Sequence, residues 1–446
     1  MTSTRYININ AYLRNSGYHE SAWKVSPEDP AQVLDVSHYI GLAKTAERGI
    51  LDSIFLPDSP GIAEFRSEHL PGAGFDPIDL LSAVSAVTSH VGLIGTVSTT
   101  YSFPWDTARR LATLDFLSRG RAGWNIVTTV EPAAAGNFGD EPHPPRADRY
   151  ERAGEYVQVV LKLWDAWEDD AAIMSRPAGT WADPEKQHPP RHRGAFYRVS
   201  SYLPFPRSPQ GHPLLTQAGS SPQGMALAAK YADAVFTPLS DIPSGIEFRA
   251  RLRSQAAASG RDPDHIRVLP GLSFLLGGTD AEAQARWRQL EGAASIEFRW
   301  RNLANLAGLD YTSIDPDAAF PPELLERAPK TSFGAAIYKL AAREPATFRE
   351  VARKLSALPG GLDFTGTPEG MADLITEWWR AGACDGFTIM PNILPGELAT
   401  FADQVVPILQ ERGIARTGYA GTTLRDHFGL PRPSSRTTGR SFLPRS

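Results

Sequence analysis

The fold is decided by the stretch Leu117-Ser118-Arg119-Gly120-Arg121-Ala122-Gly123-Trp124-Asn125-Ile126-Val127-Thr128-Thr129. Residues 105–116 before it carry apolar side chains at helical spacing, and Gly120 ends the helix because glycine readily takes the left-handed conformation. Residues 122–127 are mostly apolar, which predicts a short buried strand that ends in polar groups. A helix leading into such a strand is typical of a barrel active site, although an ordinary helix–strand turn with Trp124 in the core fits the same pattern.

The alternation of strand and helix continues along most of the chain. Strands are predicted at residues 6–13, 53–58, 91–100, 122–129, 213–219, 234–238, 266–276 and 386–391. Helices are predicted at 33–48, 77–89, 105–116, 148–167, 221–231, 246–259, 280–290, 368–381 and 398–412. Eight strands that alternate with helices predict an α/β fold, a closed (β/α)8 TIM barrel in a single domain over residues 1–446. An open, doubly wound sheet is the alternative.

Four segments interrupt or follow this pattern: residues 130–147, 168–212, 293–360 and the C-terminal extension 415–446. Long connections in a compact domain are often functional. We expect 168–212 to form an active-site flap or an edge insertion and, together with 293–360, to cover the pocket and set substrate choice. The extension is rich in Arg, Ser, Thr and Pro, so we expect it to be solvated or to lie along a partner.

Composition excludes several classes of function. A net charge of −5 gives no basis for a nucleic-acid partner. The single cysteine, Cys384, excludes an internal disulfide framework and fits a reducing compartment. The opening residues lack an apolar signal core and no apolar run reaches membrane-spanning length, so we expect a cytoplasmic protein without a membrane anchor. His188 and His192 are four residues apart, but the two prolines between them prevent a helical metal site, and no metal is expected.

In a barrel of this kind the functional residues lie on the loops that follow the strands. The polar residues at these ends are His19, Asp58, Thr99, the segment Asn125–Thr129, and Gly219-Ser220-Ser221-Pro222 directly before a helix. Small residues at a helix N-terminus leave backbone N–H groups free to bind an anion such as a phosphate. The same pattern suits a plain helix cap at Ser221, and the two roles are compatible.

The string GRAGWNIVTT (residues 120–129) resembles the signature of the flavin-dependent monooxygenases related to nitrilotriacetate, dibenzothiophene-sulfone and long-chain alkane monooxygenases, a branch of the luciferase-like superfamily. Further similar stretches run in the family order over about residues 5–430. They are GYHESAW (17–23), DSIFLPD (52–58), STTYSFPWDTARRLATLDFLSRGR (98–121), DRYERAGEYVQVVLKLWDAWEDD (148–170), QAGSSPQGMALAAKYADAVF (217–236) and CDGFTIMP (384–391).

The resemblance implies a two-component enzyme that uses reduced FMN and O2. A separate NAD(P)H:flavin reductase would supply the reduced FMN, and a flavin peroxide would then oxygenate a small organic substrate by oxidative C–N, C–S or C–C cleavage or by hydroxylation. It also implies a homodimer or homotetramer. It does not name the substrate, because the family acts on sulfones, amines, alkanes and flavins. Two alternatives are an F420-dependent oxidoreductase of the same superfamily and a non-catalytic flavin-binding protein.

The resemblance also implies which residues hold the FMN phosphate. Ser220 and Ser221 match the loop that binds it, and Tyr150 matches the tyrosine of an Arg-Tyr pair. The family places a phosphate-binding histidine four residues before this tyrosine, where this chain has Arg146. Guanidinium binds phosphate at least as well as imidazole, so Arg146 is a candidate ligand; His143 could replace it, and Arg146 could instead be a solvated loop charge.

A second set of residues is implied to surround the flavin ring and the substrate. Asp58, Thr99, Asn125 and Thr129 match positions around the isoalloxazine ring and ribityl chain. Their alternatives are structural: strand residues for the two threonines and a helix cap for Asp58. His19 matches the substrate side of the pocket, where it could stabilise a flavin hydroperoxide, and its alternative is a solvated loop position. We therefore predict His19, Asn125 and Thr129 as the catalytic residues.

Overall fold

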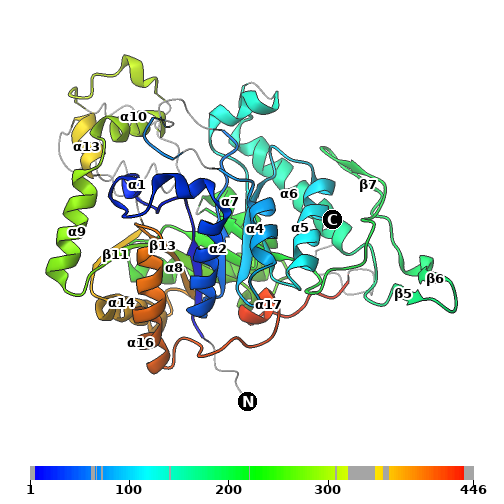
Figure 1. Ribbon diagram of the computed structural model, residues 1–446. Coiled ribbons are helices and arrows are strands. Elements are labelled where there is room, and N and C mark those ends of the chain that lie inside the picture. The colour runs from blue at the N-terminus through cyan, green and yellow to red at the C-terminus, as the bar shows by residue number, and fades with distance from the viewer. Residues whose placement is uncertain are drawn as a thin grey trace.

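Eight parallel strands close into a barrel that is surrounded by helices (Figure 1). The computed structural model describes residues 6–61, 66, 68–71, 74–139, 142–219, 221–306, 309–319, 347–354 and 361–435. Neighbouring strands pair in the order β1-β2-β3-β4-β9-β10-β11-β13, and β13 pairs with β1 to complete the circle. The strands are β1 (Asn8–Tyr12), β2 (Ser53–Leu56), β3 (Gly92–Ser98), β4 (Ala122–Val127), β9 (Leu214–Ala218), β10 (Ala234–Thr237), β11 (Arg267–Leu276) and β13 (Gly386–Pro391). The predicted TIM barrel and its eight strands are confirmed, and the open sheet is excluded.

The helices begin where the sequence supplies caps. Asp76, Ser221, Asp241 and Thr367 each accept a hydrogen bond from a backbone N–H in the first turn of a helix that starts with or beside proline. The long helices are α2 (Val36–Arg48), α4 (Pro77–Ser85), α5 (Pro104–Leu117), α6 (Arg146–Trp164), α7 (Pro222–Tyr231), α8 (Ile242–Ala258), α9 (Asp280–Gly292), α10 (Ile296–Leu306) and α14 (Pro368–Arg380). None of the helices in the described ranges is long and apolar enough to cross a membrane.

The helix predicted at 398–412 is interrupted. It consists of α15 (Gly396–Thr400), a π-helical turn at Phe401–Val405 and α16 (Val406–Glu411). Pro407 lies at the start of α16, where a proline without an N–H cannot continue the regular hydrogen-bond ladder. The shorter elements of the chain are α1 (Ala22–Val25), η1 (Pro30–Leu34), η2 (Pro132–Phe138), η3 (Pro184–Lys186), η4 (Pro263–His265), η5 (Tyr311–Ser313), α13 (Phe348–Lys354) and α17 (Leu424–His427).

Residues 168–212 form an edge insertion. It contains two hairpins, β5 (Ala172–Ser175) with β6 (Thr180–Ala182), which projects away from the barrel, and β7 (His192–Arg193) with β8 (Arg198–Val199), which lies nearer α6 (Figure 1). Glu155 of α6 accepts hydrogen bonds from the backbone N–H groups of Phe196 and Tyr197. The structure favours the edge insertion. The Tyr197 hydroxyl donates to Thr99 O at 3.5 Å, directly after β3, and a role of this insertion in covering the pocket stays a prediction.

The described part of the 293–360 insertion lies beside the mouth, with α10 and α13 stacked against each other (Figure 1). Arg299 of α10 pairs with Glu20 of the loop after β1, which places this insertion next to the strand ends. The remaining predicted parts, including the prolines at 321, 322, 329 and 345, lie outside the described residues. One further strand, β12 (Leu362–Gly366), was not predicted and extends the sheet along the second half of β11.

The C-terminal extension closes the floor of the barrel through residues 424–430, so the expectation of a solvated tail was wrong for this segment, whereas residues 417–423 are largely exposed. Leu424, Phe428 and Leu430 pack in one apolar cluster with barrel residues such as Leu214 and Ala234. Phe428 is 1% exposed. The arginines of the tail are buried too, because carboxylates at strand starts pair with them: Arg416 with Asp52, and Arg425 with Asp233 at 2.9 Å. The N-terminal end of the barrel is therefore filled by residues that follow the last barrel strand in the chain.

This closure makes stability depend on pH through His427, a buried residue of α17. Burial, together with the charge of Arg416, lowers the pKa of His427 to about 4 from its usual 6.5. Between these values the unfolded chain binds more protons than the folded chain, so stability falls as pH decreases through this window. We expect unfolding free energy, measured by urea denaturation, to fall by about 2 kcal/mol from pH 7 to pH 5 through this group.

Two variants isolate the contribution of His427. His427→Leu should reduce the loss of stability between pH 7 and pH 5 by the same amount. His265→Leu, which changes a half-exposed histidine near Asp262, should leave the pH dependence as in the original protein. Identical pH curves for the original chain and His427→Leu would contradict the assignment.

Candidate functional site

The N-terminus of α7 carries a cradle of hydrogen-bond donors at the carboxyl end of β9. Gly219 turns the chain after the strand with φ +136°, a conformation that side chains rarely adopt, and Ser221 caps the helix by accepting from Gly224 N at 3.1 Å. A Cβ atom on Gly224 would lie 3.1 Å from Ser221 Oγ, 3.2 Å from the Tyr150 hydroxyl and 3.3 Å from Gln217 Nε2. Three groups that can donate hydrogen bonds thus surround the Gly224 Cα on one side, where a side chain would crowd them and glycine leaves room for a ligand to approach.

Two further features give this cradle a preference for anions. The N-terminus of α7 contributes the positive end of the helix dipole. Arg146, in the first turn of α6, lies with its guanidinium 5.7 Å from the ring centre of Tyr150. His143 instead contacts the Tyr101 hydroxyl at 2.6 Å, so Arg146, and not His143, lies beside Tyr150. Ser220 lies outside the described residues.

Gln217 provides an acceptor next to these donors. Its Nε2 donates to Ala218 O at 2.7 Å, while its buried Oε1 has no hydrogen-bond partner in the described chain. Buried polar atoms are almost always paired, so this oxygen suits a donor on a ligand, such as a hydroxyl group. A phosphate with a polyol chain supplies both the acceptors and the donors that this cradle lacks.

Asn125 lies inside the barrel at the level of the cradle. Its Nδ2 donates to Thr96 Oγ1 at 2.9 Å, and Thr216 Oγ1 donates to its Oδ1 at 3.5 Å. Asn125 pairs in register with Thr216 of β9, three strand positions before the loop that leads to Ser221. Asn125 and Ser221 therefore lie at the same end of the barrel, as the proposed cofactor requires.

Thr129 adopts a strained backbone conformation. Its φ of +43° is rare for a β-branched residue. Arg149 of α6 holds this turn by donating to the carbonyl oxygens of Thr128, at 2.8 Å, and of Thr129. The Thr129 hydroxyl is fixed at 2.6 Å from Ser98 Oγ. Strain that is held by a buried arginine is common at binding sites, which supports a role for Thr129 beyond that of a strand residue.

Thr99 and Asp58 have different surroundings. Thr99 directly follows β3, its hydroxyl donates to Val127 O at 3.1 Å and its side chain is fully buried, so its predicted contact with a flavin stays a prediction. Asp58 lines two adjoining cavities at the mouth, and burial together with the charge of Asp76 raises its pKa. Its carboxylate therefore remains a candidate ligand.

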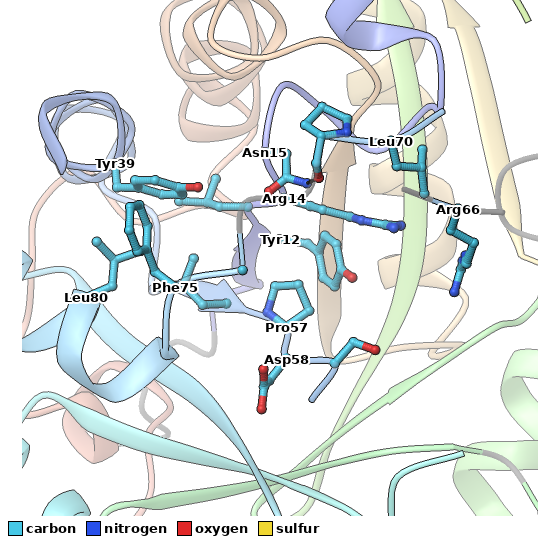
Figure 2. A pocket seen from close by; sticks show the side chains of 15 residues that line it. Tyr12, Arg14, Asn15, Tyr39, Pro57, Asp58, Arg66, Leu70, Phe75 and Leu80 are labelled. Atoms are coloured by element: carbon cyan, nitrogen blue, oxygen red, sulfur yellow. Dashed lines mark hydrogen bonds between the residues drawn. The ribbon is translucent and has the colours of Figure 1, made fainter. Parts of the chain in front are cut away.

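The two cavities share Asp58, Ser59 and Gly74. One has a volume of about 540 Å³ and is lined by Thr96 and Ser98, the hydrogen-bond partners of Asn125 and Thr129. The other, of about 300 Å³, lies under the loop after β1 and is drawn in Figure 2. Both volumes are within the range of small-molecule sites, although the residues of the α7 cradle line neither cavity.

His19 is not brought together with these groups. Its Nδ1 accepts from Ser21 N at 3.1 Å, and its Nε2 lies 3.0 Å from the Glu291 carboxylate. Although burial raises the pKa of Glu291, hydrogen bonds from His19 and Arg299 bring it to about 2. The imidazole is buried with both nitrogens engaged, so it ties the loop after β1 to α9, and its predicted contact with substrate stays a prediction.

Three contributors to the site were missed from the sequence. Gly224 and Gln217 flank the cradle, and Arg149 supports Thr129. Gly224 had a recognisable signal, because a glycine in the first turn of a capped helix lowers helix stability without an obvious structural benefit. Gln217 and Arg149 had none, since their role depends on how α6 packs beside α7.

Comparisons with known proteins agree with this fold. Residues 18–384 match a family model described as luciferase-like monooxygenase. The chain is 42% identical to N-acetyl-S-(2-succino)cysteine monooxygenase of Bacillus subtilis (strain 168), covering 98% of this chain and 99% of the relative. It is 38% identical to nitrilotriacetate monooxygenase component A of Aminobacter aminovorans, again covering 98% and 99%. The crystal structure of riboflavin lyase with modified FMN and substrate riboflavin has a TM-score of 0.85 at 30% identity, covering 99% of this chain and 98% of that one.

Proposed function

This chain belongs to the luciferase-like monooxygenase family, and on that premise we propose that it is the oxygenase component of a two-component, FMN-dependent system in the cytoplasm. It would use reduced FMN and O2 to oxygenate a small organic substrate. The observation that carries the proposal is the cradle at the α7 N-terminus, where Ser221, Tyr150 and Gln217 surround one side of Gly224, beside Arg146. The names of the relatives cover several substrates, so they do not name this one.

The residues of the chain divide the work of binding. Ser221, Tyr150 and Arg146 would bind the phosphate, and Gln217 Oε1 would accept a hydroxyl of the ribityl chain. Reduced FMN, when bound, supplies the electrons and the activation of O2. The barrel wall behind the larger cavity, in which Thr96 bridges to Asn125, would orient the ring edge and exclude water from the reacting face.

A partner protein and an oligomer are part of the proposal. The relative from Aminobacter aminovorans is named as component A, which indicates that it works with another component. We infer that the partner here is an NAD(P)H:flavin reductase that supplies reduced FMN. The assembly that we propose is a homodimer or homotetramer, to be measured by light scattering.

A comparison of FMN with riboflavin tests the cradle directly. Riboflavin has the same ring and polyol chain without the phosphate, so we expect FMN to bind at least tenfold more tightly in a fluorescence titration. Hydrogen bonds to a charged group contribute about 1.5–3 kcal/mol each, which justifies this factor. Equal affinity for the two flavins would contradict a phosphate site at α7.

Oxygen uptake distinguishes the alternatives to this function. With a reductase, NADH, FMN and a candidate substrate, we expect O2 consumption coupled to product formation. Turnover with reduced F420 under argon, but none with reduced FMN and O2, would instead identify an F420-dependent enzyme. Tight FMN binding without coupled O2 uptake for any candidate substrate would identify a non-catalytic flavin-binding protein.

A further inference from the structure

The smaller cavity at the mouth carries an arrangement of charge that the flavin does not explain. It lies between the loop after β1, the end of β2, the first turn of α4 and the residues Arg66, Leu70 and Pro71 (Figure 2). One end is lined by Arg14 and Arg66, with the amide of Asn15 nearby. The opposite end reaches Asp58, where this cavity adjoins the larger one.

Arg14 extends into this cavity without a partner. It is half-buried, and none of the residues that the structure describes accepts a hydrogen bond from its guanidinium or forms an ion pair with it. Figure 2 shows its side chain running across the cavity toward Arg66. Most long charged side chains that lose contact with water in a protein gain an ionic partner, so Arg14 suits a ligand of opposite charge.

Arg66 adds a second guanidinium to the same end. Its Nη1 lies 3.5 Å from Glu131, a long and weak ion pair, and its buried Nε has no hydrogen-bond partner within the described ranges. Burial and the positive charge of Arg14 together lower the pKa of Arg66. Two partly desolvated arginines repel each other, and a planar oxyanion that accepts hydrogen bonds from both would relieve this cost.

The remaining walls of the cavity are mostly apolar. Leu56, Leu70, Phe75 and Leu80 line it, with the ring of Tyr39. A ligand that matches this cavity has an anionic end at the arginines and an apolar or weakly polar body. The carboxylate of Asp58 would repel a second anion at the other end, so the body would point toward the junction with the larger cavity.

We propose that the substrate of this enzyme is an organic acid whose carboxylate binds to Arg14 and Arg66. The proposal rests on the function given above, because it assigns the substrate class of the same mouth. In this orientation the carboxylate anchors the molecule away from the reacting face, and the carbon or heteroatom to be oxygenated lies near Asp58 and Ser59. Arg14 and Arg66 determine specificity, and neutral molecules of the same shape bind poorly.

Pairs of acids and their methyl esters test the substrate class without knowledge of the substrate. The probes are succinate with dimethyl succinate and benzoate with methyl benzoate, measured by isothermal titration and ligand-observed NMR. We expect at least one acid to bind tenfold or more tightly than its ester, and Arg14→Gln to remove this preference. Arg14→Lys should restore part of it, because lysine keeps the charge but not the planar fork.

Arg109→Gln is the matched control. Arg109 pairs with Asp106 on the exposed side of α5 and is not among the residues that line this cavity. The control should keep the acid preference, and both Arg14 variants should keep the thermal midpoint of the original chain. Three results would overturn the proposal. The first is equal binding of an acid and its ester, and the second is no binding of either acid at about 10 mM, a very weak affinity for a specific site. The third is an acid preference that survives Arg14→Gln.

The FMN titration separates this proposal from the proposed function. Arg14→Gln should bind FMN as the original chain does, because Arg14 lies outside the phosphate cradle. Failure of FMN binding with an intact acid preference would contradict the proposed function and leave the carboxylate site standing. Normal FMN binding without an acid preference would contradict the carboxylate site alone.

Discussion

Replacing Gly224 by alanine is expected to weaken FMN binding about hundredfold while leaving the fold intact. The new methyl group would lie 3.1–3.3 Å from Ser221 Oγ, the Tyr150 hydroxyl and Gln217 Nε2, so it would crowd these donors and keep a phosphate oxygen from approaching them. Losing two hydrogen bonds to a charged group costs about 3 kcal/mol, which corresponds to roughly a hundredfold change in dissociation constant. A fluorescence titration with oxidised FMN measures this dissociation constant.

The fold should tolerate this change because Gly224 is in a helix. Alanine is favoured over glycine there by about 1 kcal/mol, which offsets the small shift that the neighbouring side chains must make. Gly41→Ala in α2 is the matched control, since a Cβ atom on Gly41 would have no neighbour within 4 Å. If Gly224→Ala binds FMN as tightly as Gly41→Ala does, the phosphate does not lie in this cradle.

Replacing Phe428 by alanine is expected to destabilise the protein by about 3–5 kcal/mol, the usual cost of removing a fully buried phenylalanine. Phe428 is 1% exposed and packs in the cluster that closes the barrel floor. The loss would be a large part of the stability of a typical protein, which is about 5–15 kcal/mol. Urea denaturation and the thermal midpoint both measure it.

An exposed phenylalanine is the control that shows whether the loss of stability depends on the buried position of Phe428. Phe103 is 70% exposed, so Phe103→Ala should change the unfolding free energy by less than about 0.5 kcal/mol. A solvated tail predicts the same small effect for Phe428→Ala. Similar midpoints for the two variants would therefore show that residues 424–430 do not seal the barrel in solution.

The barrel was predictable because its signal is repeated. Each of the eight strands is four to ten residues long and is followed by a helix, so errors at single boundaries did not change the count. The strand β12 was missed because it belongs to no strand–helix repeat and pairs only with the second half of β11. β12 can pair with β11 because β11 extends over ten residues, and an apolar pattern does not reveal that length.

The tail was misread because charged residues usually indicate exposure. Arg416 and Arg425 are buried only because Asp52 and Asp233 lie at the starts of distant strands, and nothing in the local sequence of the tail shows such partners. The apolar residues Leu424, Phe428 and Leu430 have the spacing of a short helix, but a four-residue helix gives too little periodicity to recognise.

The location of a candidate site residue could be predicted where it follows from the strand or loop to which the residue belongs. Ser221 and Asn125 come from a strand end or the loop after it, and their place at the mouth follows from the barrel itself. The meeting of Tyr150 with Gly224 and the convergence of Arg14 on Arg66 depend on the packing of separate segments. Their chemistry could be inferred only after those segments were placed.

The closure of the floor by residues 424–430 has a consequence for biosynthesis. All eight strands precede Pro391 in the chain, so a ribosome completes the barrel wall before it reaches the residues that fill the lower opening. Until those residues emerge, the nascent chain presents the apolar surface around Leu214 and Ala234 to water, a condition that favours aggregation or chaperone binding. A premature stop codon after residue 412 would therefore yield every strand of the barrel and the N-terminus of α7, yet leave the apolar floor uncovered, and we expect such a product to be degraded.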